Sequence, residues 1–447
     1  MNITIIGTGY VGLVSGVCLA SRGHNVTCVD INLEIVEKLN KGEVTIYEKD
    51  LKSLLKKTLL ENKFRATTDL GQALQSASIV IIAVGTPSLD NGLIDLSYIK
   101  KVSQTLGRYI GSTNRFITVI VKSTVIPGTT DGLVREEIEK FSSKKIGQFG
   151  LGMNPEFLRE GNAVDDFINP DRIILGYESD KTCLLLKELY KSWNVDKLYV
   201  NTRTAELIKY ANNMMLATQI SATNELANLA FALGGIDIMD VVKGVQLDKR
   251  WNPIINGSRT NPEILRYLIP GCGFGGSCFT KDINALKSQG KSLGVKMSVA
   301  DSILDTNNDQ PYQVVKILES EFKNLFKKKI LILGLAFKPE TDDVRESPTI
   351  KIVTDLLRKK ALVSAHDPVA VENFKSTFKS ISSNIDFVKD WKSKIYDSDI
   401  SIITTPWSEY SFLNDIDFKG KIVIDAKRAF SSNYFKNATY RSIGWRL

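Results

Sequence analysis

The chain has 447 residues, of which 43% are hydrophobic and 24% charged, which predicts a folded globular protein of two to three domains and excludes a disordered chain. The net charge of +8 comes from lysines and arginines spread along the whole sequence, so it does not indicate a nucleic-acid partner. No apolar run reaches the ~18 residues that a membrane helix needs, and the N-terminus lacks the features of a signal peptide.

The five cysteines are scattered and odd in number. This pattern favours reduced thiols and a cytoplasmic location over a disulfide framework. Only two histidines are present and the cysteines are not clustered, so we expect no metal site.

The first predicted strand leads into a dinucleotide-binding fingerprint. The run 3–6 is followed by Gly7, Gly9, Tyr10, Val11 and Gly12, then by a helical pattern to Ser21 and a second strand, 25–29, that ends in Asp30. The three glycines allow a tight turn, the approach of a pyrophosphate and close helix packing, and the helix N-terminus faces the phosphate charge. Asp30 would accept hydrogen bonds from the adenosine ribose and repel a 2′-phosphate, so we predict NAD rather than NADP.

Two more buried-type strands are predicted at 79–84 and 116–121. Thr86 and Thr124 follow them, at the sheet edge where ligands of parallel sheets bind. Their hydroxyls could bond a cofactor or hold a water, or they could cap the next helices.

Residues 154–161 form a predicted polar loop that contains Glu156, Arg159 and Glu160. These side chains could orient a sugar and a nicotinamide ribose. They could equally form the exposed first turn of a helix, where acids are favoured by the helix dipole.

From Thr204 to Leu233 apolar residues recur at helical spacing without Pro or Gly, which predicts one long helix that joins two halves and supplies a dimer surface. Lys209 and Asn213 lie four residues apart on one face of it. They could direct a cation at a developing alkoxide, although a surface lysine is the simpler interpretation.

A polar stretch, 246–270, leads into a glycine-rich loop that ends in Cys278, Lys281 and Asp282. Cys278 is a possible nucleophile, and Asp282 is a possible base about one helical turn later. The simpler alternative is a turn that ends in a buried cysteine.

After Phe326 a second α/β half is predicted, with strands at 329–335, near 366, at 400–404 and at 422–425, and a helix that opens at Pro348. It lacks the glycine fingerprint, so it should serve something other than the dinucleotide. Its candidate phosphate or carboxylate contacts are Lys338, Arg345, Lys427 and Arg428. The predicted fold is α/β, with two Rossmann-like doubly wound domains joined by a long central helix.

Seven motifs, in order, resemble the UDP-glucose/GDP-mannose dehydrogenase family over essentially the whole chain. They are G-T-G-Y-V-G (7–12), V-G-T-P (84–87), K-S-T-V (122–125), N-P-E-F-L-R-E-G (154–161), A-E-L-I-K-Y-A-N-N (205–213), G-F-G-G-S-C-F-T-K-D (273–282) and F-K-P-E-T-D-D-V-R-E-S-P (337–348). The resemblance implies a 1–200 NAD-binding domain, a 201–315 central domain with the dimer surface and the cysteine loop, and a 316–447 nucleotide-sugar-binding domain.

The resemblance also implies a four-electron oxidation of a sugar C6 alcohol to a carboxylate with two NAD, through a thiohemiacetal and a thioester on Cys278. Lys209 and Asn213 would stabilise the C6 oxyanion. Asp282, and a water near Thr124 and Glu156, would handle protons.

By the same resemblance, the residues that would contact NAD are Gly7, Gly9, Tyr10, Val11, Gly12, Asp30, Thr86, Thr124, Glu160, Lys281 and Arg345. Those that would contact the nucleotide sugar are Glu156, Phe157, Leu158, Arg159, Glu160, Lys209, Asn213, Tyr267, Leu268, Ile269, Pro270, Gly271, Gly275 and Lys338. The expected assembly is a homodimer, with neither nucleic acid nor membrane as a partner.

Several alternatives stay open at this point. The motif at 337–345 favours UDP-glucose, but V-G-T-P-S also occurs in GDP-mannose dehydrogenases, and a UDP-N-acetylhexosamine is a further candidate. Ile35 stands where many relatives have a basic residue, and 246–270 is longer than usual. Outside the family, the rivals are a β-hydroxyacid dehydrogenase, which needs no cysteine, and a non-enzymatic NAD sensor.

Overall fold

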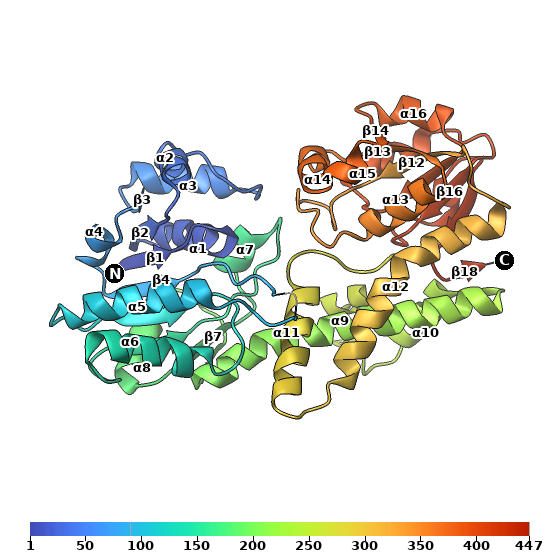
Figure 1. Cartoon of the computed structure of the whole chain (residues 1–447). Helices are drawn as coiled ribbons and strands as arrows, with labels where there is room; N and C mark the ends of the chain where they lie inside the picture. Colours follow the sequence, from blue (N-terminus) through green and yellow to red (C-terminus); the bar gives the residue numbers. More distant parts are fainter. Residues whose placement is uncertain (90, 447) are drawn as a thin grey trace. The chain divides into compact units, whose positions relative to one another are not determined.

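The computed structural model describes residues 1–89 and 91–446 and divides the chain into two compact units (Figure 1). The first unit contains residues 1–212 and 288–293, and the second contains residues 213–287 and 294–447. Helix α9 (Thr202–Leu233) has 32 residues and runs from the first unit into the second. The prediction of an α/β fold with a long linking helix is confirmed.

The first unit is built on an eight-stranded sheet with the order β3-β2-β1-β4-β5-β6-β7-β8. Neighbouring strands are parallel except for β6 and β7. The strands are β1 (Asn2–Ile6), β2 (Asn25–Val29), β3 (Phe64–Thr67), β4 (Ile79–Ile82), β5 (Thr118–Val121), β6 (Gly150–Met153), β7 (Ile173–Tyr177) and β8 (Lys197–Val200). The order reverses between β1 and β4, so a ligand crevice is expected beyond the carboxyl ends of these strands.

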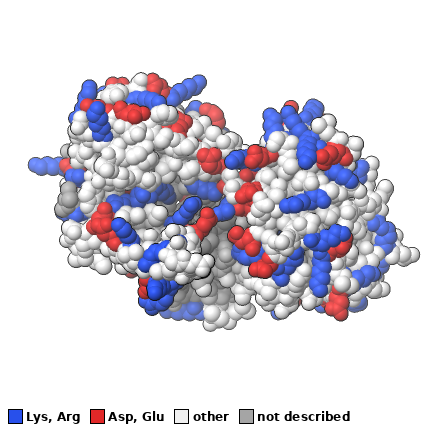
Figure 2. Space-filling model, turned by 180° about the vertical axis from the view of Figure 1, so that it is seen from behind, with Lys and Arg blue, Asp and Glu red and all other residues white. Residues whose placement is uncertain are grey.

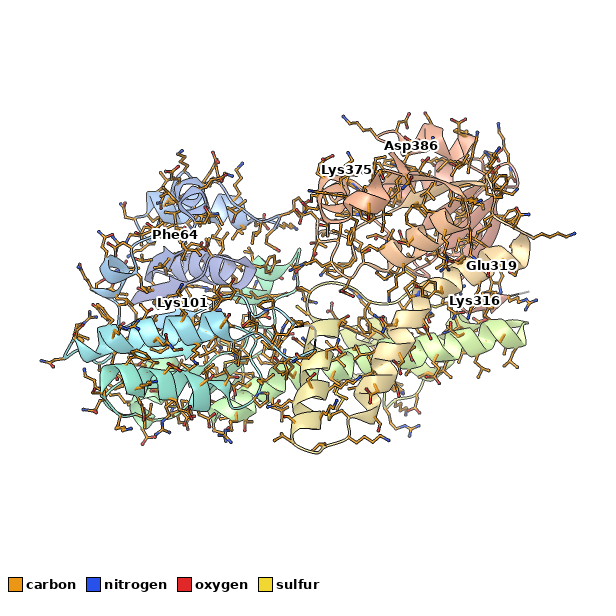
Figure 3. The ribbon with its side chains drawn as sticks, viewed as in Figure 1. Phe64, Lys101, Lys316, Glu319, Lys375 and Asp386 are labelled. Carbon is orange, nitrogen blue, oxygen red and sulfur yellow. The ribbon has the colours of Figure 1, made fainter. Side chains whose placement is uncertain are left out.

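Helices cover both faces of this sheet, because side chains alternate along each strand. Ile3 and Ile5 of β1 join one core with α1 (Tyr10–Ser21), α3 (Leu51–Leu60) and α7 (Ala163–Ile168). Ile6 points to the other core, with α5 (Ser97–Gly111) and α6 (Arg135–Ser142). Phe64 of β3, labelled in Figure 3, belongs to the first of these cores. The remaining helices are α2 (Leu33–Asn40), α4 (Leu70–Leu74) and α8 (Asp180–Leu189).

The second unit contains a sheet with the order β14-β13-β12-β15-β16-β17-β18-β9, parallel from β14 to β17 and antiparallel beyond. Its strands are β9 (Ile236–Asp237), β12 (Lys329–Leu333), β13 (Leu362–His366), β14 (Ile385–Phe387), β15 (Ile400–Ile403), β16 (Ile422–Asp425), β17 (Thr439–Ser442) and β18 (Trp445–Arg446). The six parallel strands repeat the order of the first sheet.

Further helices follow α9 in the chain. They are α10 (Ile238–Gln246), α11 (Phe279–Ser292), α12 (Ser298–Glu321), α13 (Pro348–Arg358), α14 (Val371–Thr377), α15 (Lys379–Ser382) and α16 (Trp391–Asp397). Glu319 of α12, labelled in Figure 3, lies 2.6 Å from Lys359 at the end of α13 and ties the two helices together. The 246–270 stretch forms a small hairpin, β10 (Ile254–Ile255) and β11 (Ser258–Arg259), and a 3-10 helix (Glu263–Leu268).

Four strands are shorter than the sequence predicts, and the smallest difference is in β15, which ends at Ile403 rather than at residue 404. β4 ends at Ile82 rather than at residue 84, because the carbonyl of Val84 accepts a hydrogen bond from the hydroxyl of Ser123 (2.7 Å) instead of from a neighbouring strand. β5 begins at Thr118 rather than at residue 116. β12 ends at Leu333 rather than at residue 335, because Gly334 turns the chain with a φ of +106°.

On the face drawn in Figure 2, Lys and Arg side chains are interspersed with Asp and Glu side chains, which agrees with a basic charge that is spread over the sequence. Within residues 1–89 and 91–446, no helix combines the length and the apolar composition that crossing a membrane requires.

Candidate active site

The glycine fingerprint forms a tight turn between β1 and α1. Gly7 has a φ of +98°, and its N–H donates to the carbonyl of Val29 (2.8 Å). A Cβ at Gly12 would lie 2.0 Å from the carbonyl oxygen of Gly7, whereas a Cβ at Gly9 would meet nothing within 4 Å. No side chain caps α1 at Gly9, so its first N–H groups remain available to a pyrophosphate.

Asp30 lies beside this turn at the end of β2. One carboxylate oxygen accepts the N–H and the hydroxyl of Thr8, and the other accepts the N–H of Asn32 (3.0 Å). Asp30 is partly exposed, so its remaining lone pairs can accept ribose hydroxyls. The open space at Gly9, the uncapped helix and Asp30 together fit NAD. Ile35 packs against the core of this unit.

Tyr10 connects α1 to the 154–161 loop through Glu48, a residue that the sequence did not indicate. Its hydroxyl donates to Glu48, which also accepts the N–H groups of Gly161 (2.8 Å) and Ala163 (2.9 Å). Burial and the Glu48 carboxylate raise the pKa of Tyr10 well above its ordinary value. Nothing in the sequence around Glu48 marks it, because its partners are 38 to 115 residues away.

Thr86 and Thr124 meet at the carboxyl edge of the first sheet. The hydroxyl of Thr86 donates to the carbonyl of Thr124 (2.8 Å), and both residues are half-buried. The structure therefore brings together two residues that the sequence placed on separate strands.

Glu156 and Lys209 form a buried ion pair. The Lys209 Nζ lies 2.9 Å from Glu156 Oε1, and their side chains are 6% and 7% exposed. Burial raises the pKa of Glu156, but the ammonium of Lys209, the N–H of Leu158 and the charge of Lys122 outweigh it and lower the pKa overall. The interpretations of Lys209 as a surface lysine and of Glu156 as an exposed first-turn acid are therefore wrong.

The rest of the 154–161 loop surrounds this pair. The ring of Phe157 has Lys209 Nζ 5.5 Å and the guanidinium of Arg172 4.1 Å from its centroid. Leu158 donates its N–H to Glu156 (2.7 Å). Arg159 is exposed and pairs with Asp166 at 2.6 Å, while Glu160 is half-buried.

Cys278 is exposed at the start of α11, whereas Cys18, Cys28, Cys183 and Cys272 are buried. The Cys278 carbonyl accepts the N–H of Asp282 (2.8 Å), so the predicted helical turn between them is present. The interpretation of Cys278 as a buried structural cysteine is wrong.

Asp282 is buried between an amine and an amide. One oxygen lies 2.8 Å from Lys281 Nζ, and the other accepts the amide N–H of Asn213 (2.7 Å). Asn213 reaches it from α9.

Amide side chains hold the loop before Cys278. The N–H of Gly271 donates to the side chain of Asn224 (2.8 Å), and the carbonyl of Gly271 accepts from the side chain of Gln310 (2.9 Å). Asn307 accepts the N–H of Phe274 and donates to the carbonyl of the same residue. The sequence analysis missed all three, because isolated amides on helices carry no pattern. In the predicted substrate stretch, Leu268, Pro270, Gly271 and Gly275 are buried, Tyr267 is half-buried and Ile269 is exposed.

The predicted cations of the second sheet differ in their surroundings. Lys338 is half-buried, and Arg345 is exposed and pairs with Asp343 (2.7 Å). Lys427 donates to the carbonyl of Gly273 (2.7 Å). The side chain of Arg428 is 5% exposed and pairs with Asp237, so its surroundings are those of a structural ion pair.

No group of three or more His, Cys, Asp or Glu residues is placed to hold a metal ion within residues 1–89 and 91–446. Sequence comparison identifies three domain models of one family, the UDP-glucose/GDP-mannose dehydrogenase family. They are its NAD binding domain (residues 1–194), its central domain (203–309) and its UDP binding domain (331–432). The prediction of NAD as the cofactor is confirmed by the first of these.

Named relatives match over nearly the full length. The chain is 36% identical to the UDP-glucose 6-dehydrogenase AglM of Haloferax volcanii, over 96% of this chain and 97% of that protein. It is 38% identical to the UDP-glucose 6-dehydrogenase of Rickettsia bellii, over 100% and 98%.

Solved structures agree. A UDP-glucose dehydrogenase from Pyrobaculum islandicum has a TM-score of 0.89 at 36% identity, with 99% of this chain and 97% of that chain covered. A GDP-mannose dehydrogenase from Pseudomonas aeruginosa has a TM-score of 0.55 at 31% identity, with both chains fully covered. With three family domains in order and full-length relatives, the chain belongs to the UDP-glucose/GDP-mannose dehydrogenase family.

Proposed function

We propose that this chain is a UDP-glucose 6-dehydrogenase that oxidises C6 of UDP-glucose to the carboxylate of UDP-glucuronate with two NAD. The relatives named above support this substrate, and the family supports the enzyme class over a β-hydroxyacid dehydrogenase or an NAD sensor. The observation that carries the proposal is the exposed Cys278 at the start of α11, one turn before the buried Asp282.

NAD would be held by the Gly7–Gly12 turn and Asp30, with Thr86, Thr124, Glu160, Lys281 and Arg345 as further contacts. When bound, NAD accepts a hydride from C6 at each of the two oxidations. The dipole of α1 and its uncapped N–H groups would stabilise the pyrophosphate charge.

In the first oxidation the C6 hydroxyl must lose its proton. A water between Thr124 and the ionised Glu156 would take it and pass it to bulk water, so that Glu156 keeps its charge beside Lys209. Lys209 and Asn213 would donate hydrogen bonds to the oxygen at C6 as negative charge develops on it.

In the second stage the sulfur of Cys278 would add to the aldehyde carbon, forming a C–S bond and an oxyanion. Loss of the second hydride leaves a thioester on Cys278. Water then forms the new C–O bond as the C–S bond breaks, Asp282 takes the proton of that water, and the thiolate is regenerated. A covalent intermediate keeps the reactive aldehyde from being released.

The nucleotide sugar would be bound by 156–160, 267–271, Gly275 and Lys338. The match of 331–432 to the family's UDP binding domain supports a UDP-sugar as the ligand. The amide clamp of Asn224, Asn307 and Gln310 would keep the 271–274 backbone in place for this ligand. The proposal divides the chain into three domains, 1–200, 201–315 and 316–447.

We also propose a cytoplasmic homodimer. The exposed residues Met215, Leu226, Leu229 and Leu233 share one face of α9 by helical spacing. Burying this face between two copies would remove apolar area from water. Leu229→Glu should then give a monomer in light scattering, and an unchanged dimer would contradict this surface.

The test is the yield of NADH per mole of limiting UDP-glucose, beside GDP-mannose and UDP-N-acetylglucosamine. We expect two NADH per UDP-glucose for the wild type and for Cys183→Ser, a control at a buried cysteine, and a collapse for Cys278→Ser. Two NADH from GDP-mannose or UDP-N-acetylglucosamine instead would assign that nucleotide sugar as the substrate. One NADH that is unaffected by Cys278→Ser would overturn the covalent role of Cys278.

A further inference from the structure

Lys122, immediately after β5, is a buried cation to which the sequence analysis gave no role. The residue is 4% exposed, and its Nζ donates to Oδ1 of Asn154 (2.8 Å) and lies 5.6 Å from the ring centroid of Phe167. An ammonium inside a protein is costly unless charges or hydrogen bonds compensate it. A lysine in this place therefore requires an explanation beyond packing.

Asn154 fixes this ammonium rigidly. The same Oδ1 accepts the hydroxyl of Tyr190 (2.6 Å), and Nδ2 donates to the carbonyl of Ile174 (2.9 Å). All these groups are buried, and they come from separate elements of the first unit. The amide therefore cannot rotate without losing several hydrogen bonds, and Lys122 is held in one position.

The charges that act on Lys122 are Glu156 and Lys209. Burial lowers the pKa of Lys122 to about 8, the Glu156 carboxylate opposes this shift, and the Lys209 ammonium adds to it. Tyr190 also faces the cluster, but burial raises its pKa further above its ordinary value, so it stays neutral. The buried cluster thus holds two cations and one anion, a net charge of +1 near neutral pH.

We propose that Lys122 is a positioning residue of the oxidation, which supplies the net positive charge that a C6 oxyanion needs without touching it. The inference rests on the proposed function. With Lys122 charged, an oxyanion that accepts from Lys209 brings the cluster from +1 to zero. Without that charge, Glu156 and Lys209 neutralise each other, and the oxyanion would leave the buried cluster at −1.

The inference predicts a specific kinetic signature. The charge matters when the oxyanion forms and not when the sugar binds, so its loss should lower kcat with little effect on KM. Because the pKa of Lys122 is about 8, wild-type kcat should fall as the pH rises through this value and the cluster loses its charge. Arginine does not titrate in this range, so Lys122→Arg should move that decline to higher pH.

The experiment measures kcat and KM for UDP-glucose from pH 6.5 to 9.5 for the wild type, Lys122→Met, Lys122→Arg and Tyr190→Phe. We expect Lys122→Met to lose roughly 100-fold in kcat at pH 7 with KM within about threefold. Tyr190→Phe is the matched control, because it removes the neutral donor to the same Asn154 oxygen and should keep kcat near wild type. Thermal unfolding of each variant reports its folding.

A Lys122→Met enzyme with wild-type kcat would overturn the inference, as would an equal loss in Tyr190→Phe, which would indicate a purely structural role. If Lys122→Met does not fold, Lys122→Arg decides, since an alkaline decline that stays at the wild-type pH contradicts the charge argument. A wild type that produces no NADH from any of the three sugar nucleotides would instead contradict the proposed function itself.

Discussion

The two sheets of this protein share a strand order and also a turn. Gly7 and Gly334 both follow the first strand with φ near +100°, and each donates its N–H at 2.8 Å to the last residue of the next strand, Val29 or His366. The residue after that is an aspartate in both sheets, Asp30 and Asp367. Thr8 and Leu335, which follow the glycines, donate their N–H groups to these carboxylates.

The two sheets differ in the residues beyond this turn. In the first sheet α1 begins at Tyr10, three residues after Gly7, with an uncapped N-terminus. In the second sheet α13 begins only at Pro348. There Asp367 is buried and accepts the N–H groups of Leu335, Ala336, Val369 and Ala370 and the indole N–H of Trp407.

Topology alone therefore does not create a dinucleotide site. The first turn leaves N–H donors for a ligand phosphate, whereas the second satisfies its donors with its own carboxylate. One doubly wound sheet can therefore offer a dinucleotide site while a sheet of the same strand order does not.

The largest effect should come from Gly334→Ala. The new Cβ would lie 2.3 Å from Thr405 Cβ in a backbone of φ +106°, so the free energy of unfolding should fall by about 3 kcal/mol or more. Gly9→Ala is the matched change in the first sheet, where a Cβ meets nothing within 4 Å. It should leave the unfolding temperature unchanged and raise KM for NAD roughly 10- to 100-fold, because the methyl group occupies the place of the pyrophosphate.

Thermal unfolding and NADH kinetics of the two variants check this pair. If Gly334→Ala unfolds at the wild-type temperature, the turn of the second sheet is not as rigid as its geometry indicates. If Gly9→Ala binds NAD normally, the cofactor does not approach this turn.

Substitutions of Asp30 and Asp367 should also divide into an effect on cofactor binding and an effect on stability, and both effects should be smaller than those of the glycine substitutions. Asp367→Asn leaves an amide among five N–H donors, and the free energy of unfolding should fall by about 2–3 kcal/mol with KM for NAD unchanged. Asp30→Asn should cost about 1 kcal/mol or less, raise KM for NAD roughly tenfold and improve the use of NADP relative to NAD.

Denaturant titrations and steady-state kinetics with both cofactors measure these changes. An Asp30→Asn enzyme that still rejects NADP as strongly as the wild type would show that another group discriminates the 2′-phosphate. An Asp367→Asn protein of wild-type stability would mean that water replaces the lost acceptor.

The fold could be predicted from the sequence because its signals are local. The strands, the G-x-G-x-x-G turn and the uninterrupted α9 pattern all depend on residues that are neighbours in the chain. β4 ended two residues earlier than predicted because Ser123 bonds the carbonyl of Val84, and β12 did so because Gly334 turns the chain.

The candidate site was only partly predictable for the same reason. Cys278, Asp282, Lys209 and Asn213 stand in recognisable motifs, but the burial that makes Lys209 a partner of Glu156 comes from segments more than 50 residues away. Glu48, Asn224 and the buried state of Lys122 leave no trace in the local pattern. Long-range burial and hydrogen bonding decide what such side chains do, and sequence spacing does not report them.

Buried carboxylates also differ in how many donors surround them. Glu206 on α9 is fully buried and accepts the backbone N–H groups of Gly128 (2.7 Å) and Thr130 (2.8 Å), whereas Asp367 accepts from five donors. Burial raises the pKa of Glu206 to about 7, against the lowering effect of these hydrogen bonds. Its ionised form is therefore poorly compensated in the fold.

A change of stability with pH is predicted for Glu206. Because its pKa is raised in the folded state, the protonated form stabilises the fold below the unfolded pKa of 4.5, and this stability is lost as the pH rises through about 7. From pH 5.5 to 7.5 the free energy of unfolding should fall by roughly 1–2 kcal/mol through this group, and Glu206→Gln should remove that part of the dependence. Urea titrations at both pH values, with the exposed Glu136→Gln as control, measure it. An equal pH dependence in Glu206→Gln and the wild type would mean that water or a shift of the 128–130 backbone stabilises the buried carboxylate.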